Sequence, residues 1–349
     1  MELSIHASAS QKGVNMEKIN KEMFTRISTQ DHQVQEMVFD TGATFFKDAW
    51  KRFRKNKGGV IGLFAIIFIL TMAIIGPWLG THVYNELIAE HIDLPARVPF
   101  LEYFGIFDGS VNGFNPYIKK GLTDVYYWFG TDNLGRDLWS RVWMGTRISF
   151  FVAFVAVTID VVFGITYGLI SGYFGGKVDL VMQRIVEVIS GIPNLVVVIL
   201  LVLVLKPGLT SIILALMITG WISMSRVVRS QTLKIKEMEF VLAAKSLGAS
   251  SFVIIAKEVL PNIIGQIIVM TMFSIPSAIF YESFLAFIGL GLQPPVASLG
   301  VLISRGYLAM LTYPHMVTFP VVVLSTLMLS FNLVADGLRD AFDPKMKGF

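Results

Sequence analysis

The chain offers few side chains that could carry out chemistry on a substrate. It contains no cysteine, which excludes disulfides, iron–sulfur clusters, thiolate zinc sites and cysteine nucleophiles. Its histidines are far apart in the sequence and form no HExxH-type ligand pair; they are His6, His32, His82, His91 and His315. The sequence also lacks a GxxxxGK[ST] phosphate-binding loop. It therefore supports neither metal catalysis nor ATP binding by the chain itself.

One ionisable side chain is placed where its charge would be costly. Asp160 lies within a long apolar segment, and an ionised carboxylate at the bilayer centre costs about 3 kcal/mol. We expect this side chain to face protein or water, which makes it a candidate for a polar pathway or a subunit interface. A hydrogen-bonded structural aspartate explains the same position equally well.

Composition and apolar runs predict an all-α membrane protein. Hydrophobic residues make up 54% of the chain and charged residues 15%, about ten percentage points less charge than in a typical soluble domain. Apolar runs predict six transmembrane helices, at 60–79, 148–170, 188–205, 211–225, 263–281 and 316–334. The apolar stretch from Ser283 to Leu292 is too short to cross, so we expect a re-entrant or interfacial segment there.

The distribution of Lys and Arg predicts the orientation of these spans. With the N-terminus in the cytoplasm, 21 of the 29 Lys and Arg residues fall on cytoplasmic segments, and six spans place both termini there. Arg136, Arg141 and Arg147 fit less well, because they precede the second span on the outside. The formal net charge of +4 thus reports topology, and we expect no nucleic-acid partner.

The spans divide the chain into five segments. We expect a polar cytoplasmic tail at 1–45, a basic juxtamembrane segment with the first span at 46–79, an external loop subdomain at 80–143, a five-helix core at 144–338 that includes a cytoplasmic loop at 226–261, and a cytoplasmic C-terminal tail at 339–349. The basic, aromatic-bearing stretch Lys47–Lys57 is interpreted as a lipid anchor in preference to a partner-binding site.

Local signals predict caps and bends. Asp132 or Asp137 is expected to cap the helix that enters the second span, in preference to contacting a ligand. Prolines remove backbone hydrogen bonds and so predict bends in two spans. The bend in the third span is expected at Pro193 with Asn194, and the bend in the sixth span at Pro320.

The most informative segment is the cytoplasmic loop between the fourth and fifth spans. Residues at spacing i, i+3, i+4 and i+7 predict one face of a short helix, whose central alanines would let another surface approach closely; they are Phe240, Ala243, Ala244 and Leu247. Gly248 is expected to end this helix in a left-handed conformation.

A second helix is expected directly after this glycine. Ser250 or Ser251 can cap it. The same apolar spacing repeats at Phe252, Ile255, Ala256 and Val259. Pro261 is then expected to open the fifth span. The segment predicts a helix, a glycine turn and a second helix on the inner membrane face.

This segment, EFVLAAKSLGASSFVIIAKEVLPN, resembles the cytoplasmic loop signature of bacterial ABC-importer permeases. The small-residue pair, the glycine and the late proline match in type and spacing, whereas Leu242 stands where the signature has a glutamate. The resemblance implies that the segment docks onto a separate ATPase. The residues expected to couple it are Glu239, Phe240, Ala243, Ala244, Leu247, Gly248 and Pro261.

Three further stretches resemble the dipeptide, oligopeptide and nickel permease family: GTDNLGRDLWSRVWMGTRIS from Gly130, SFLAFIGLGLQPPVASLG from Ser283, and FNLVADGLRDAFDP from Phe331. The resemblance implies the six-helix type I ABC-importer permease architecture with a large external loop. Glu282 matches a glutamate of the family motif and, with Asp160, is a candidate for the translocation path. The SGYFGGKVD segment looks most like the oligopeptide subunit of Gram-positive bacteria.

The resemblance also implies an assembly in the bacterial cell membrane. It would contain a second homologous permease, two cytoplasmic ATPases that bind ATP and Mg, and an extracellular peptide-binding lipoprotein, with no cofactor in this chain. The implied function is import of oligopeptides by alternating access, and the same family importing dipeptides or nickel is the alternative. A membrane-embedded enzyme or a scaffold is the alternative from a different class, although an enzyme would need catalytic groups that converge at one depth.

Overall fold

The protein is described by a computed structural model that covers residues 42–80, 82–111, 113–293 and 295–342. It divides into two compact units, Met1–Asp48 and Ala49–Phe349. In the first unit the described residues form the start of α2 (Gly42–Phe53), and the elements that follow belong to the second unit. Most of the predicted N-terminal tail and part of the C-terminal tail lie outside the described residues.

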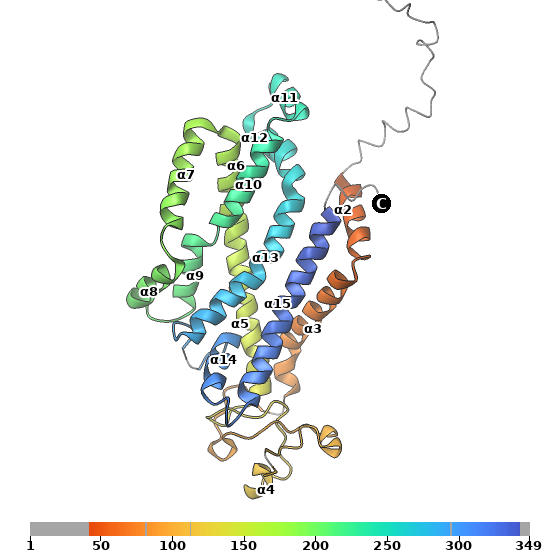
Figure 1. Ribbon diagram of the computed structural model, residues 1–349, viewed down its shortest axis with the longest axis vertical. Coiled ribbons are helices and arrows are strands. Elements are labelled where there is room, and N and C mark those ends of the chain that lie inside the picture. Colours follow the sequence, from red (N-terminus) through yellow and green to blue (C-terminus); the bar gives the residue numbers. More distant parts are fainter. Residues whose placement is uncertain (1–41, 81, 112, 294, 343–349) are drawn as a thin grey trace, which may run out of the picture. The chain divides into compact units, whose positions relative to one another are not determined.

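The described residues form helices and no β-strand, as the sequence predicts. Five continuous helices are long and apolar enough to cross a membrane, and a bent pair of helices supplies a sixth crossing if it is counted as one span. The continuous helices run over Lys57–Leu79, Leu138–Phe174, Leu209–Ile235, Ser251–Phe287 and His315–Phe342 (Figure 1). The all-α fold class is therefore confirmed.

These long helices are built from shorter elements. They are α3 (Lys57–Leu79); α5 (Leu138–Ile159), a π-helical turn at Asp160–Gly164 and α6 (Ile165–Phe174); α9 (Leu209–Thr219) and α10 (Ile222–Ile235); α12 (Ser251–Ile254), a π-helical turn at Ile255–Val259 and α13 (Leu260–Phe287); and α15 (His315–Phe342). Both α3 and α13 pack against α5 and α15, while α10 packs against α6. The main apolar core lies where these helices meet.

The second crossing begins ten residues earlier than predicted, at Leu138. Arg141, expected in the external loop, and Arg147, expected on the outside just before the second span, both lie within α5. Arg141 is fully buried beside Asp132, and Arg147 donates hydrogen bonds to carbonyl oxygens of α3. A span predicted from hydropathy alone is too short here, because hydropathy does not take account of partners that charged side chains find inside the protein.

The bent pair stands where the third crossing is predicted, and it is formed by α7 (Gly176–Ser190) and α8 (Asn194–Leu205) at an angle of 71°. The bend predicted at Pro193 and Asn194 is confirmed, because Pro193 directly precedes the first residue of α8. The predicted span at 188–205 covers α8 but misses most of α7, which carries several charged side chains. Pro320 lies inside α15, and the bend expected there stays a prediction.

Pro261 lies in the first turn of α13, as predicted, but α13 is the continuation of a helix that begins before the proline. The continuous helix begins at Ser251, and Pro261 follows the π-helical turn at Ile255–Val259. A proline cannot donate to the carbonyl four residues before it. In the π-helical turn the Leu260 N–H donates a hydrogen bond to the Ile255 carbonyl oxygen, five residues earlier. The helix therefore continues without a break up to the proline.

The apolar stretch Ser283–Leu292 is not a separate re-entrant segment. Its first part completes α13, which ends at Phe287, and Gly289 turns the chain with a φ of +86°. A helix that the sequence analysis does not predict, α14 (Leu299–Leu308), then packs against α13 and α15. With 10 residues, it is too short to cross a bilayer.

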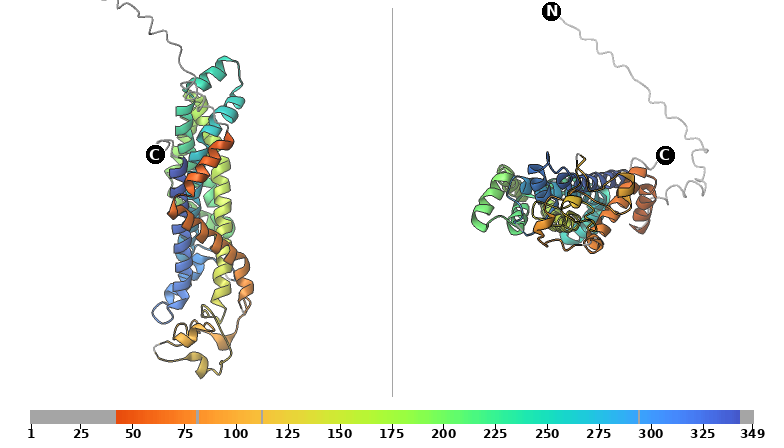
Figure 2. Two further views of the ribbon diagram at one scale, coloured as in Figure 1. Left: turned by 90° about the vertical axis from the view of Figure 1, so that its right-hand side faces the viewer. Right: turned by 90° about the horizontal axis from the view of Figure 1, so that it is seen from below.

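The loop between α3 and α5 has a small core of its own. Its short helices are Ala89–His91, Leu101–Phe104 and α4 (Pro116–Lys119). Leu94, Tyr117 and Tyr127 are buried together beneath them. Within the unit Ala49–Phe349, this loop lies at one end of the long helices, and α11 (Glu239–Ser246) lies at the other end (Figure 2).

Candidate functional site

The first candidate surface is α11, the short helix predicted in the cytoplasmic loop. It ends at Gly248, whose φ of +82° is the left-handed conformation expected from the sequence. The N–H groups of Gly248 and Ala249 bond to the carbonyl oxygens of Lys245 and Ala244, so the last carbonyls of the helix are satisfied. No atom of the described residues would touch a Cβ added at Gly248, so the backbone conformation, and not packing, favours glycine here.

The second predicted helix is capped by Ser250. Its side chain accepts a hydrogen bond from the Val253 N–H at 3.4 Å. Phe252 is 80% exposed, whereas Ile254 and Val259 are buried. The predicted helix, glycine turn and helix are therefore present, and the second helix continues directly into the fifth membrane helix.

The two sides of α11 differ in exposure. Phe240 and Leu247 are 39% and 88% exposed, and Ala243 is also exposed. Val241, on the other side, is 2% exposed. Ala244, expected beside Ala243 on the free face, is half-buried against the same core as Val241, because residues three apart lie on one side of a helix. We call Phe240, Ala243 and Leu247 the α11 face.

The other predicted coupling residues lie outside this face. Glu239 is exposed in the first turn of α11, where a negative charge suits the helix dipole. Leu242, at the glutamate position of the signature, is exposed. Pro261 belongs to α13, so it is part of a membrane helix and not of the α11 face.

The buried side of α11 joins several membrane helices. Val241 belongs to one apolar cluster with residues of α6, α10 and the fifth membrane helix, namely Leu169, Met224, Val228, Ile254, Val259, Ile263 and Ile267. Packed interiors are dense and shift between discrete arrangements. A displacement of α11 must therefore move or strain the helices that this cluster joins.

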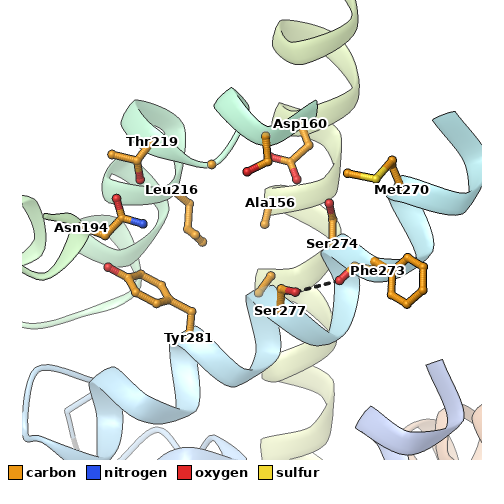
Figure 3. A pocket seen from close by; sticks show the side chains of 13 residues that line it. Ala156, Asp160, Asn194, Leu216, Thr219, Met270, Phe273, Ser274, Ser277 and Tyr281 are labelled. Atoms are coloured by element: carbon orange, nitrogen blue, oxygen red, sulfur yellow. Dashed lines mark hydrogen bonds between the residues drawn. The ribbon is translucent and has the colours of Figure 1, made fainter. Parts of the chain in front are cut away.

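The second candidate site is a cavity of about 300 Å³ among the membrane helices (Figure 3). Residues of α5, α9 and α13 contribute to its wall, together with Asn194 at the start of α8. The polar side chains on its wall are Asp160, Asn194, Thr219, Ser223, Ser274, Ser277 and Tyr281. Asp160 is the one charged side chain among the described residues that line it.

Asp160 starts the π-helical turn and is 9% exposed. It has the Ser274 hydroxyl as a hydrogen-bond partner. A Cβ at Gly220 would lie 3.1 Å from its Oδ1, so the glycine lets the junction between α9 and α10 approach the carboxylate. Asp160 is thus hydrogen-bonded and also lines a cavity, and its expected role in a translocation path stays a prediction.

Glu282 is not among the described residues that line this cavity. It is fully buried, and its Oε2 accepts hydrogen bonds from Ser149 at 3.2 Å and from Ser283 at 3.5 Å. Its Oε1 has no hydrogen-bond partner among the described residues. The Ser149 contact ties α13 to α5, which is a structural anchor and separates Glu282 from the cavity site.

The GTDNLGRD segment forms the cap and turn expected for it. Asp137 accepts hydrogen bonds from the N–H groups of Trp139 and Ser140 and caps α5. Asp132 accepts from the Arg136 N–H and forms an ion pair of 2.6 Å with the Arg136 side chain. Both aspartates therefore stabilise the N-terminal end of the second crossing: Asp137 caps the helix, and Asp132 bonds the turn that precedes it.

Comparison with known proteins decides the family. Residues 164–348 match the family described as "Binding-protein-dependent transport system inner membrane component". Residues 44–97 match "N-terminal TM domain of oligopeptide transport permease C". The chain is a transport permease of this family.

Relatives match nearly the whole permease. Dipeptide transport system permease protein DppC of Bacillus subtilis (strain 168) is 44% identical over 323 residues, 92% of each chain. Oligopeptide transport system permease protein OppC of the same organism is 38% identical over 332 residues, 95% of this chain and 100% of the relative. OppC of Escherichia coli (strain K12) is 36% identical over 304 residues, 87% and 92% of the two chains. The permease is therefore a transport component and not an enzyme.

Sequence reasoning missed most of the polar wall of the permease's cavity. Ser274, Ser277 and Tyr281 lie on one side of α13, at the i, i+3 and i+7 spacing of a helix face. Polar residues at this spacing inside an apolar run could have been recognised in the sequence. Asn194 and Thr219 reach the same cavity from other helices, and only the tertiary arrangement brings them there.

Proposed function

We propose that the permease is one of two membrane subunits of an ATP-driven bacterial importer of short peptides. Relatives named for dipeptide and for oligopeptide transport both support peptide cargo. The sequence resemblance favours oligopeptides within that range, and dipeptides or nickel are the alternatives within the family.

The observation that carries the proposal is the α11 face. Large apolar side chains are exposed there on a helix whose other side is packed against the membrane helices. Apolar surface of this kind gains free energy when another protein covers it. A groove on each partner ATPase would accept the α11 face, with the small Ala243 side chain at its centre, while the ATPases bind ATP and Mg.

Alternating access follows from this docking. Closure of the ATPases on ATP would draw the docked α11 helices of the two permeases together. The shared cluster around Val241 would pass that movement to α10 and the fifth membrane helix, which also line the cavity or lie next to it. The cavity would then open to the outside, receive a peptide, and return to the inward state after hydrolysis.

The same docking gives the orientation of the permease. The end that carries α11 and the C-terminal end of α15 would face the cytoplasm, together with both termini. The folded loop between α3 and α5 would face outward and meet the peptide-binding lipoprotein. The excess of Lys and Arg on the proposed cytoplasmic segments supports this orientation.

Reconstitution tests the proposal. The permease, a second permease, both ATPases and the lipoprotein of the same organism would be placed in liposomes, and uptake of labelled dipeptide and tetrapeptide would be measured with ATP or with a non-hydrolysable analogue. We expect accumulation of peptide with ATP alone. Uptake that is equal in both conditions would contradict the proposal, and ATP-dependent uptake of Ni²⁺ without any peptide uptake would favour the nickel alternative.

A further inference from the structure

We propose that Asp160 binds the N-terminal ammonium group of a transported peptide while that peptide occupies the membrane cavity. The inference rests on the proposed import of peptides and assigns one residue to one end of the cargo. It follows from the placement of a single carboxylate among neutral polar groups (Figure 3).

Among the described residues, the carboxylate of Asp160 has no cationic partner. No Lys, Arg or His side chain is among the described residues that line the cavity, and Asp160 takes part in none of the ion pairs of the described chain. An ionised carboxylate offers about four acceptor positions, of which Ser274 engages one. Burial without a counter-charge is costly, so a cationic ligand would be stabilised here.

The surrounding groups suit an ammonium group. A primary ammonium is compact and offers three donors, so it needs acceptors on several sides. Thr219 and Ser277 donate their hydroxyl hydrogens to Ala215 and Phe273, one helical turn back, at 3.1 and 2.8 Å. Their oxygens therefore keep lone pairs that can accept from a ligand. Asn194 supplies a further amide oxygen from α8.

The geometry also selects one end of the peptide. The α-amino group has a pKa of about 7.7–8.0, so most peptides carry the ammonium at neutral pH. The C-terminal carboxylate would be repelled by Asp160. The cavity volume of about 300 Å³ is near the lower end of the usual 300–1,000 Å³ for ligand sites, which fits the end of a peptide and not a whole chain. Every unblocked peptide offers this group, so the contact would not restrict side-chain sequence.

The test compares Asp160→Asn with the parent in the reconstituted transporter. Uptake of one lysine-free tetrapeptide is measured with its N-terminus free and with its N-terminus acetylated. We express each result as the variant-to-parent ratio for the same peptide, because this ratio cancels any preference of the lipoprotein. The ratio should fall about tenfold or more for the free peptide and stay near one for the acetylated peptide.

Equal ratios for the two peptides, whether both unchanged or both reduced, would overturn the assignment. Asp160→Ser gives the same test if the asparagine variant does not assemble, and Asp160→Glu should keep the preference because it keeps the charge. Thr158→Ser is the matched control, since Thr158 is an exposed residue on α5, two positions before Asp160, and is not among the described residues that line the cavity. Failure of the parent to import either peptide would instead contradict the proposed function.

Discussion

Arg147 of α5 donates a hydrogen bond from its Nε to the backbone carbonyl oxygen of Ala73 in α3. That oxygen lacks its usual helical donor, because the residue four positions later is Pro77, which has no N–H. The same guanidinium also donates to the carbonyl of Ile74 and lies over the Trp78 ring. An arginine that the sequence analysis placed just before the second span thus satisfies carbonyl oxygens beside the proline in the first membrane helix.

Arg147→Ala should destabilise the permease by about 1.5–3 kcal/mol, the usual contribution of a hydrogen bond to a charged group. Thermal unfolding of the detergent-solubilised chain measures the loss. Pro77→Ala supplies the control, because it restores an N–H that can bond to the Ala73 oxygen. The cost of Arg147→Ala should be smaller in the Pro77→Ala background, and an equal cost in both would show that the two features are independent.

Gly248 can be tested by two replacements that differ in backbone preference. Asparagine tolerates the left-handed region and valine does not, while the space around the residue is open to either side chain. Gly248→Val should therefore destabilise the left-handed turn by about 1–2 kcal/mol and strongly reduce peptide uptake. Gly248→Asn should keep most of the uptake. Uptake per inserted transporter is the measurement. Equal uptake in the two variants would remove the turn from the coupling mechanism.

The loop between α3 and α5 should loosen as the pH falls. Burial lowers the pKa of His91, with the neighbouring His82 adding to the effect, and burial also lowers the pKa of His82. Because the unfolded loop binds protons more readily, stability is lost as the pH drops through about 6.5. His91 Nδ1 lies 2.6 Å from the Tyr127 hydroxyl, so its protonation disturbs the loop core.

Limited proteolysis of the loop at pH 7.5 and 5.5 checks this expectation. His91→Gln is the control, since it cannot take up a proton in this range and leaves the other titrating groups in place. Cleavage should rise at pH 5.5 in the parent and rise less in the variant. A rise of the same size in both would assign the pH response to other groups.

The membrane topology can be tested by labelling single introduced cysteines, because the chain contains no native cysteine that would also react. Lys119, in the loop between α3 and α5, and Lys245, in α11, are both exposed positions that can be replaced by cysteine. A membrane-impermeant thiol reagent added to intact cells should label the first and not the second. Labelling of both from the same side would contradict the proposed orientation.

The sequence predicted the crossings well where apolar runs were long, and less well where charged residues had partners inside the fold. Asp137 and Gly248 were assigned correctly because a cap and a left-handed turn are local features. Arg147 was misplaced, because its partners on α3 are 73 and 74 residues away in sequence.

The candidate sites show the same limit. Helical spacing placed Ala244 with Ala243, but the direction in which α11 packs decides which alanine is free, and that depends on the cluster around Val241. Asp160 was identified by its charge in an apolar run. Its neighbours Asn194 and Thr219 come from other helices, so no local pattern could join them to it.

The central claim, that the α11 face receives the partner ATPases, is tested most directly by copurification with Ala243→Trp. A tryptophan at the centre of a close interface overpacks it by about 1–3 kcal/mol, which corresponds to association weaker by about 5-fold to 140-fold. Leu308→Trp is the control, because Leu308 is 86% exposed on α14, near the loop end of the helices. We predict that Ala243→Trp loses the ATPases while Leu308→Trp retains them. An Ala243→Trp permease that copurifies with the ATPases and imports peptide like the parent would contradict the account.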